Sequence, residues 1–160
     1  MRLSTRGRYG VRALFDMAYT SGILPVKIKD ISRRQNISPR YLEQIFQSFK
    51  KTGILMSKRG PDGGYYLARK PEMITLREIL EAAEGDTLLV DCLDKRNGKR
   101  STCKFDTKCV TQTVWDEATE KLNEFFSETT LKSLCDKGQA MGVKKEQGAR
   151  LPMEHIPEHR

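Results

Sequence analysis

The most reactive side chains of this sequence are four cysteines, all of which follow residue 90. Cys92, Cys103 and Cys109 are separated by ten and five residues, in a stretch rich in charge, glycine and serine. The N-terminal sequence MRLSTRGRYG lacks the apolar core of a signal peptide, so disulfides are not expected and the trio indicates metal or redox chemistry. Zinc fits poorly, because structural zinc sites use closely spaced cysteine pairs. Cys135 falls on the apolar side of an expected helix, which favours a structural role.

A second set of residues has side chains that suit the reading of DNA bases. Residues 36–67 read NISPRYLEQIFQSFKKTGILMSKRGPDGGYYL. Ser38 suits a helix N-cap and Pro39 the first helical position. An apolar stripe follows at helical spacing, formed by Leu42, Ile45, Phe46 and Phe49. Polar side chains lie off this stripe near the start of the helix, among them Arg40, Tyr41, Glu43 and Gln44.

A short hairpin is expected directly after this helix. Gly53 ends the helix, residues 54–59 and 65–69 read as strands, and residues 60–64 (GPDGG) form the turn, with Arg59 at its shoulder. A polar-faced helix followed by such a hairpin is the outline of a winged helix-turn-helix. An ordinary amphipathic helix and hairpin with a solvated polar face is the alternative.

The distribution of charge favours nucleic acid over that alternative. Residues 1–70 contain 15 Lys and Arg against four acids, a net charge of +11, whereas the remaining ninety residues carry a net charge of −3. A basic surface confined to the half with the helix-turn-helix pattern is what phosphate neutralisation requires. Membrane binding would favour a basic helix with large apolar residues exposed opposite the charge, and the stripes here read as core stripes.

The remaining elements predict a mainly α fold with a small β wing. Helices are expected over residues 7–21 and 27–35, then after a capping box at Thr75 and Glu78, with Gly85 as its end. A long helix follows over residues 111–130, and a short closing helix over 130–137. The predicted organisation is a winged helix-turn-helix DNA-binding domain (1–85), a cysteine loop (86–110), a dimerisation helix with the closing helix (111–136), and a disordered tail (137–160).

The long helix is interpreted as the interface of a homodimer. Val114, Ala118, Leu122 and Phe125 form its stripe, and Trp115 widens the stripe beyond what a small domain needs. DNA operators for such domains are two-fold, so a dimer has a geometric use. Packing of this helix on its own domain is the alternative.

Other protein classes find little support. The only histidines are His155 and His159 in the expected tail, and residues 60–64 lack the strand-to-helix context of a nucleotide loop, so an enzyme is not expected. No apolar run approaches the roughly 20 residues that cross a bilayer. We expect a cytoplasmic protein without a membrane partner.

The opening MRLSTRGRYGVRAL, the helix ISPRYLEQIF, the wing RGPDGGYYL and the closing TLKSL resemble the winged-helix bacterial regulators of the Rrf type. Branches of that family include the iron–sulfur regulator IscR, the nitric-oxide sensor NsrR and the cysteine-metabolism repressor CymR. The resemblance implies a homodimeric transcriptional regulator that binds double-stranded DNA. It places Arg59 in the minor groove and five side chains in the major groove, namely Ser38, Arg40, Tyr41, Glu43 and Gln44. Arg40 stands where the IscR branch has a small hydroxyl residue, so the operator need not be shared.

The same resemblance implies that Cys92, Cys103 and Cys109 hold an iron–sulfur cluster, with 2Fe–2S preferred over 4Fe–4S. The IscR branch has a histidine as fourth ligand three residues after the third cysteine, where this chain has Gln112. The remaining candidates for a fourth ligand are solvent or one of Asp91, Asp94, Asp106, Gln112 and Cys135. Zinc, redox-sensing thiols, and a cluster-free repressor like CymR, regulated by thiol oxidation or a metabolic enzyme, are the alternatives.

Overall fold

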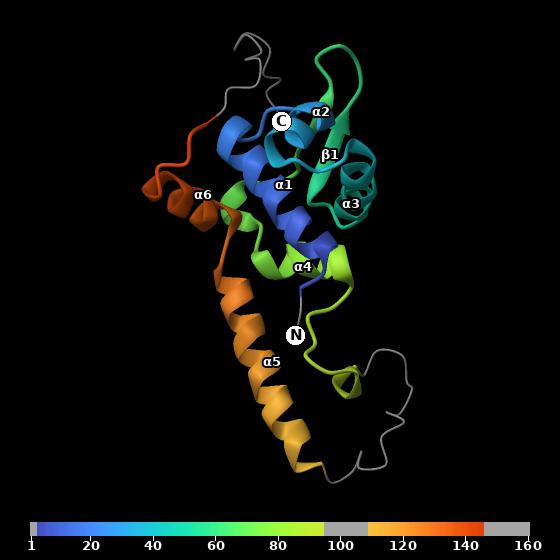
Figure 1. The fold of residues 1–160 in the computed structure, drawn as a ribbon, viewed down its shortest axis with the longest axis vertical. Coiled ribbons are helices and arrows are strands. Elements are labelled where there is room, and N and C mark those ends of the chain that lie inside the picture. Colours follow the sequence, from blue (N-terminus) through green and yellow to red (C-terminus); the bar gives the residue numbers. More distant parts are fainter. Residues whose placement is uncertain (1–2, 95–108, 146–160) are drawn as a thin grey trace.

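The helices surround one hydrophobic core, from which a single long helix projects (Figure 1). The structure is a computed structural model and describes residues 3–94 and 109–145. The elements in chain order are α1 (Thr5–Ser21), α2 (Ile28–Gln35), α3 (Pro39–Lys51), β1 (Leu55–Lys58), β2 (Gly64–Leu67), the 3₁₀ turn η1 (Pro71–Met73), α4 (Leu76–Glu84), the 3₁₀ turn η2 (Asp91–Leu93), α5 (Val110–Glu128) and α6 (Leu131–Ala140). The expected mainly α fold with a small β wing is confirmed.

Helix α3 begins and packs as its sequence predicts. Ser38 Oγ accepts a hydrogen bond from the backbone N–H of Tyr41 at 3.2 Å, and Pro39 is the first helical residue. Both features favour a helix start. The Ser38 hydroxyl satisfies one backbone N–H of the first turn, and a proline has no backbone N–H to satisfy. The four apolar residues of the stripe are all buried in the core. The polar side of α3 is therefore the side that faces away from the core.

A tight turn joins α2 to α3. Asn36 ends α2 in the left-handed conformation, with φ 51° and ψ 51°, which asparagine tolerates better than most residues. Ile37 follows and is buried, so it fixes the start of α3 to the core. This geometry gives the two helices of a helix-turn-helix.

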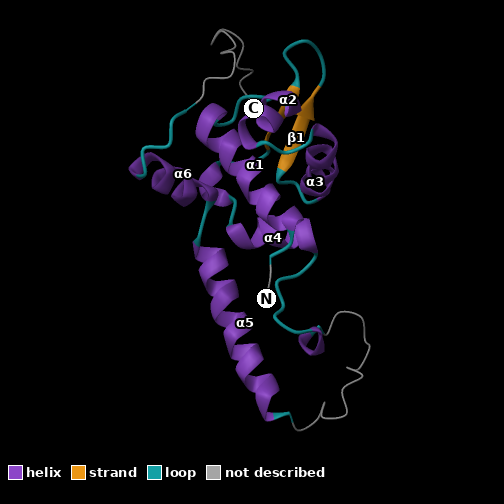
Figure 2. Cartoon of the chain, viewed as in Figure 1, coloured by secondary structure: helices purple, strands orange, loops and turns teal. Residues whose placement is uncertain are grey.

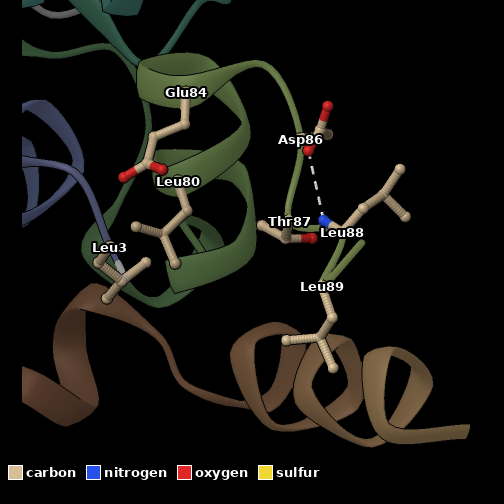
Figure 3. Close-up of a pocket in the computed structure, with 7 residues that line it drawn as sticks. All are labelled: Leu3, Leu80, Glu84, Asp86, Thr87, Leu88 and Leu89. Carbon is tan, nitrogen blue, oxygen red and sulfur yellow. Dashed lines mark hydrogen bonds between the residues drawn. The ribbon is translucent and has the colours of Figure 1, made fainter. Parts of the chain in front are cut away.

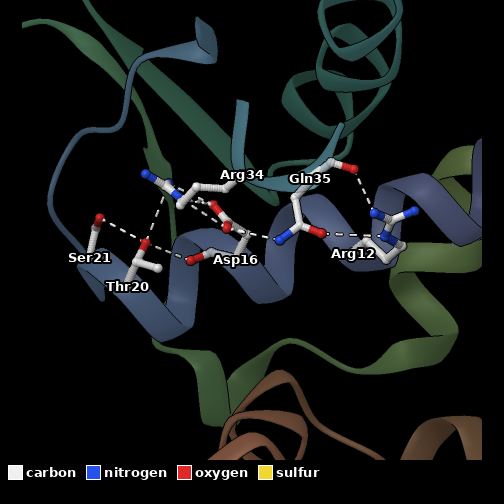
Figure 4. A network of polar contacts seen from close by, with 6 residues as sticks. All are labelled: Arg12, Asp16, Thr20, Ser21, Arg34 and Gln35. Carbon is white, nitrogen blue, oxygen red and sulfur yellow. Dashed lines mark hydrogen bonds and ion pairs between the residues drawn. The ribbon is translucent and has the colours of Figure 1, made fainter. Parts of the chain in front are cut away.

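A buried polar network holds α2 against α1 (Figure 4). The guanidinium of Arg34 donates to both carboxylate oxygens of Asp16, with the shortest distance 2.6 Å, and both side chains are 4% exposed. Gln35 also donates to Asp16, at 3.0 Å, and Arg12 donates to the side-chain and backbone oxygens of Gln35. Because Gln35 is the last residue of α2, the network fixes the point from which the turn to α3 departs.

The wing is a two-stranded antiparallel sheet in which Leu55 pairs with Leu67 and Lys58 with Gly64. The strands are shorter than expected, and β2 begins at Gly64 rather than at residue 65. Gly64 lies against the chain before α2, since a Cβ there would be 2.5 Å from the carbonyl oxygen of Val26. The pairing of Val26 with Tyr65 attaches the wing to the helix-turn-helix.

Helices α4 and α6 both start with a capping box, at Thr75 with Glu78 and at Thr130 with Ser133. The first of these was expected, as was Gly85 at the end of α4, where φ is +94°. Helix α6 continues to Ala140, so the expected end of the closing helix at residue 137 is wrong. Gly138 is buried against Phe15 of α1 and so continues the helix instead of ending it.

Helix α5 extends away from the core in Figure 2. Only Thr119 and Phe126 of its 19 residues are buried, and it is flanked by α4 and η2 on one side. Val114, Trp115 and Phe125 are 54%, 44% and 54% exposed. Intramolecular packing therefore leaves much of the apolar surface of α5 uncovered.

Candidate nucleic-acid interface and cysteine site

The first half of α3 presents polar side chains to solvent. Ser38, Arg40, Glu43 and Gln44 are all exposed, whereas Leu42, which lies among them, is buried in the core. Gln44 can pair with the two hydrogen-bonding groups of adenine, Glu43 can accept from cytosine, and Arg40 can reach guanine or a phosphate. The surface of α3 therefore has the chemistry that base reading requires.

Tyr41 differs from the other four expected major-groove contacts, because its ring is half-buried. It packs edge to face against Tyr9 of α1, with ring centroids 5.9 Å apart. The guanidinium of Arg12 lies 5.4 Å from the centroid of the Tyr9 ring, within the range of a cation–π interaction. Tyr9 was not among the expected site residues. The signal that could have indicated it is its spacing of three from Arg12, which puts both residues on one side of α1.

The wing carries its cations beside the turn. Arg59 directly follows β1 and is exposed, as is Lys58. In the same strand, directly before Lys58, Ser57 Oγ accepts a hydrogen bond from Lys50 of α3 at 3.0 Å. This contact ties the end of α3 to the wing, so the two elements expected to contact DNA are held together. An arginine in this position suits a narrow and electronegative minor groove.

Cys92 and Cys109 come from segments that approach each other at the start of α5. Cys92 lies in η2 and Cys109 is the N-cap residue of α5. Gln112 Nε2 donates to the backbone carbonyl oxygen of Cys92 at 3.4 Å, which links the two segments. Both cysteines are free thiols with partial exposure. Cys103, the third expected ligand, lies outside the described residues, as do Asp106 and both histidines.

The environment of Cys109 favours its thiolate form. Its Sγ lies 3.1 Å from the hydroxyl of Thr111, and this contact together with the backbone N–H of Gln112 lowers the pKa of the thiol below its ordinary value. Thiolates at helix N-termini are favoured in general. Within residues 3–94 and 109–145, no group of three His, Cys, Asp or Glu side chains is arranged to hold a metal ion. The two described thiols nevertheless have the soft donor atoms that iron prefers.

Cys135 belongs to a different part of the fold. It lies on α6, and burial together with the neighbouring Asp136 raises the pKa of its thiol. Cys109 precedes α5 and α6 follows it, and a helix of 19 residues spans about 28 Å. Figure 1 shows α6 and η2 at opposite ends of α5. Cys135 is therefore too distant to share an ion with Cys109 of the same chain, and the structural role expected for it is supported.

Among the described residues, none of the helices has both the length and the apolar character needed to cross a bilayer.

Comparisons with known proteins agree with this arrangement. The profile of the Rrf2 family, described as an iron-dependent transcriptional regulator, matches residues 3–137. A putative HTH-type transcriptional regulator of Haemophilus influenzae is 37% identical over 137 residues, which cover 86% of this chain and 88% of that protein. The HTH-type transcriptional regulator IscR of Klebsiella pneumoniae is 36% identical over 147 residues, 92% of this chain and 87% of its own.

Two solved structures extend the similarity to three dimensions. IscR of T. potens has a TM-score of 0.71 at 32% identity and covers 91% of this chain and 94% of its own. CymR, the global cysteine regulator of B. subtilis, has a TM-score of 0.70 at 28% identity and covers 86% and 98%. Because the family profile matches residues 3–137 and these curated relatives are more than 30% identical over most of their length, the chain belongs to the Rrf2 family of winged-helix transcriptional regulators.

Proposed function

We propose that this chain acts as a homodimeric DNA-binding regulator whose affinity for its operator responds to an iron–sulfur cluster held by Cys92, Cys103 and Cys109. The observation that carries the proposal is the link between Gln112 and the Cys92 carbonyl, which brings two of these cysteines to one end of α5. The lowered thiol pKa of Cys109 supports thiolate ligation there. The segment that holds Cys92 follows α4, so its state can act on the DNA-binding domain.

On DNA, the exposed side chains at the start of α3 would lie in the major groove. The set is Ser38, Arg40, Tyr41, Glu43 and Gln44. Arg59 at the wing would enter the adjacent minor groove. Double-stranded DNA is the partner that the charge of residues 1–70 favours, since that half carries a net charge of +11.

A second copy of the chain would cover the exposed apolar side of α5. Val114, Trp115 and Phe125 lie there, and apolar residues exposed along a projecting helix are typical of an interface. A dimer would place two copies of α3 on a two-fold operator. The substitution Trp115→Glu should give a monomer in sedimentation velocity, and the wild-type chain should sediment as a dimer.

The fourth ligand of the cluster would not be a histidine, since both histidines of the chain lie in its last six residues. Gln112 occupies the position expected for it, and Asp91, Asp94, Asp106 or solvent are the other candidates. When bound, the cluster would supply a redox-active group sensitive to oxidants and to iron supply. Of the two common types, 2Fe–2S is preferred.

Anaerobic purification of the untagged protein tests the proposal directly. We expect a brown protein with visible absorption and with iron and acid-labile sulfide in equal amounts, and iron per monomer separates 2Fe–2S from 4Fe–4S. Protein that stays colourless and iron-free after anaerobic reconstitution would overturn cluster binding. Stoichiometric zinc without sulfide would do the same.

The similarity to CymR at a TM-score of 0.70 favours a second candidate, a cluster-free repressor regulated by thiol oxidation or by a metabolic-enzyme partner. It predicts normal dimers and normal DNA binding after Cys103→Ala, with no visible chromophore. A loss of iron and a change of operator affinity in the same variant would exclude it.

A further inference from the structure

The carboxylate of Glu84 is bound to the start of α1, far from it in sequence. Glu84 is the last residue of α4, and its Oε1 accepts hydrogen bonds from the backbone N–H and from the hydroxyl of Ser4, both at 3.0 Å. Ser4 is the N-cap of α1, and its Oγ accepts in turn from the backbone N–H of Gly7 at 3.1 Å. Figure 3 shows the Glu84 side chain directed toward the N-terminal segment at Leu3. The cap of α1 is therefore completed by α4.

Gly7 makes room for this contact. A Cβ at position 7 would lie 1.9 Å from Glu84 Oε1 and 2.9 Å from its carboxyl carbon. A glycine inside a helix is destabilising relative to alanine, because it has more backbone freedom to lose. Gly7 is buried in the first turns of a helix without a positive φ, so the close approach of Glu84 accounts for it.

Glu84 also supplies a negative charge that the first turn of α1 lacks. The first turn of α1 contains no acidic residue, and Arg6 and Arg8 put two cations near the positive end of the helix dipole. An anion at a helix N-terminus is stabilising, and cations there are not. The carboxylate of Glu84 offsets this repulsion across the interface between α1 and α4.

The N-terminal half of α1 lies along α3, the helix proposed to read bases. Tyr9 packs against Tyr41 in the first turn of α3, and Arg12 lies over the Tyr9 ring. Arg8 precedes Tyr9 and is exposed, and Arg6 donates to Ser48 of α3. The basic first turn of α1 thus flanks α3, where cations can contact the phosphates on either side of a major groove.

We propose that Glu84 is a positioning residue for DNA binding, which holds the basic first turn of α1 in place for backbone contacts. This rests on the proposed DNA-binding function. The effect expected of removing Glu84 is unusual, because Glu84 is an acid. Removing a negative charge from a DNA-binding domain ordinarily strengthens binding. Removing Glu84 should weaken it.

The test compares Glu84→Ala with Glu81→Gln, a matched control on the same helix. Glu81 accepts from Arg77 at 2.8 Å, within its own helix. The probe is a duplex selected from a random-sequence pool by the wild-type protein. We expect about tenfold weaker binding for Glu84→Ala, as for loss of charge-assisted hydrogen bonds. Glu81→Gln should bind as wild type or more tightly.

Two further readouts separate positioning from general stability. In Glu84→Ala the plot of log affinity against log salt concentration should become less steep, by the amount that one phosphate contact per chain contributes. The reason is that the first turn of α1 no longer holds its cations against the DNA backbone. Glu84→Gln keeps an oxygen that can accept from Ser4, so it should retain more affinity than Glu84→Ala. Thermal melts confirm that each variant is folded at the assay temperature.

Gly7→Ala tests the same contact with a substitution that favours helix formation. Its Cβ should displace the Glu84 carboxylate, so DNA binding should weaken even though the helix itself is not disfavoured. In the Glu84→Ala background the same change should cost no further affinity, since the two residues act through one contact.

The outcomes are distinct. Equal or tighter operator binding by Glu84→Ala, with an unchanged salt slope, overturns the positioning role and leaves the proposed regulator intact. A wild-type protein that selects no DNA sequence overturns the proposed function, and the positioning role with it.

Discussion

Tyr9 of α1 and Tyr41 of α3 meet edge to face, with their ring planes at 88° and their centroids 5.9 Å apart. Edge-to-face geometry is a favoured arrangement of aromatic pairs. The contact joins the first helix of the chain to the first turn of the helix proposed to enter the major groove. Its consequence is that the orientation of Tyr41, and of the polar residues beside it, depends on a residue of α1.

Replacing Tyr9 by leucine should therefore weaken operator binding more than it weakens the fold. The aromatic pair contributes about 0.5–1.5 kcal/mol beyond buried area, and Arg12 loses the ring over which it lies. Operator affinity measured by fluorescence anisotropy should fall several-fold. Tyr9→Phe keeps the ring pair and should bind as wild type, and equal losses in both variants would show that the hydroxyl matters instead.

Removing one partner of the buried ion pair between Asp16 and Arg34 should lower the free energy of unfolding. Asp16→Ala removes the carboxylate that accepts from both Nε and Nη2 of Arg34, and the cost of leaving a buried charge without its partner is about 3 kcal/mol or more. Urea unfolding should show this loss. The double variant Asp16→Leu/Arg34→Leu should lose less than the single one, because no buried charge remains. A double variant as unstable as the single one would contradict this account.

Glu78 gives a pH dependence whose sign is fixed by its contacts. Burial acts to raise the pKa of its carboxyl, but hydrogen bonds from Thr75 and the nearby Arg69 outweigh it, so the pKa lies below the ordinary value. A carboxyl with a lowered folded-state pKa stabilises the fold above the unfolded pKa, and this stabilisation is lost as pH falls through the folded pKa. The difference in unfolding free energy between wild type and Glu78→Gln should thus shrink below about pH 4. A difference that stays constant from pH 7 to pH 3 would refute the role of the charge.

The sequence predicts the local features of this fold well, because their causes lie within a few residues. The start of α3 follows from Ser38 and Pro39, and the start of α4 from Thr75 and Glu78, which satisfy backbone donors of their own helices. The end of α6 was misplaced for a tertiary reason. Gly138 reads as a helix end, but Phe15 packs against it and the helix continues.

Contacts between distant segments could not be predicted in the same way. Glu84 and Ser4 are 80 residues apart, and neither the pattern of α4 nor that of α1 indicates the other. The pairing of Tyr9 with Tyr41 depends on the angle between two helices. For the cysteine site, the structure links the segments of Cys92 and Cys109 through Gln112, whereas Cys103 lies outside the described residues, so the ligand set stays a prediction.

Gln44→Ala should reduce discrimination at one base pair of the operator. The side chain is exposed on α3, and a glutamine paired with adenine through two hydrogen bonds is worth about 1–3 kcal/mol of discrimination. Affinities for operators changed at each position in turn measure this. A uniform loss across all sequences would instead identify Gln44 as a backbone contact.

Arg59→Ala tests the expected DNA contact of the wing, as Gln44→Ala tests that of α3. If Arg59 reads the width of the minor groove, the variant should lose its preference for A·T-rich flanks and keep its preferences in the major groove. Unchanged flank preference and unchanged affinity would show that the wing does not contact DNA.

Cysteine substitutions should divide the four thiols into two groups. Cys109→Ser removes a thiol whose pKa is lowered by Thr111 and the start of α5, so the anaerobically purified variant should lose its iron, sulfide and visible absorption. Cys135→Ser changes a thiol at the opposite end of α5, with a pKa raised by burial, and should keep all three. Both variants should remain folded dimers, because Cys109 is partly exposed at a helix start and serine nearly preserves the size of Cys135. Loss of iron from Cys135→Ser would instead mean that a thiol of α6 reaches the cluster of a second chain.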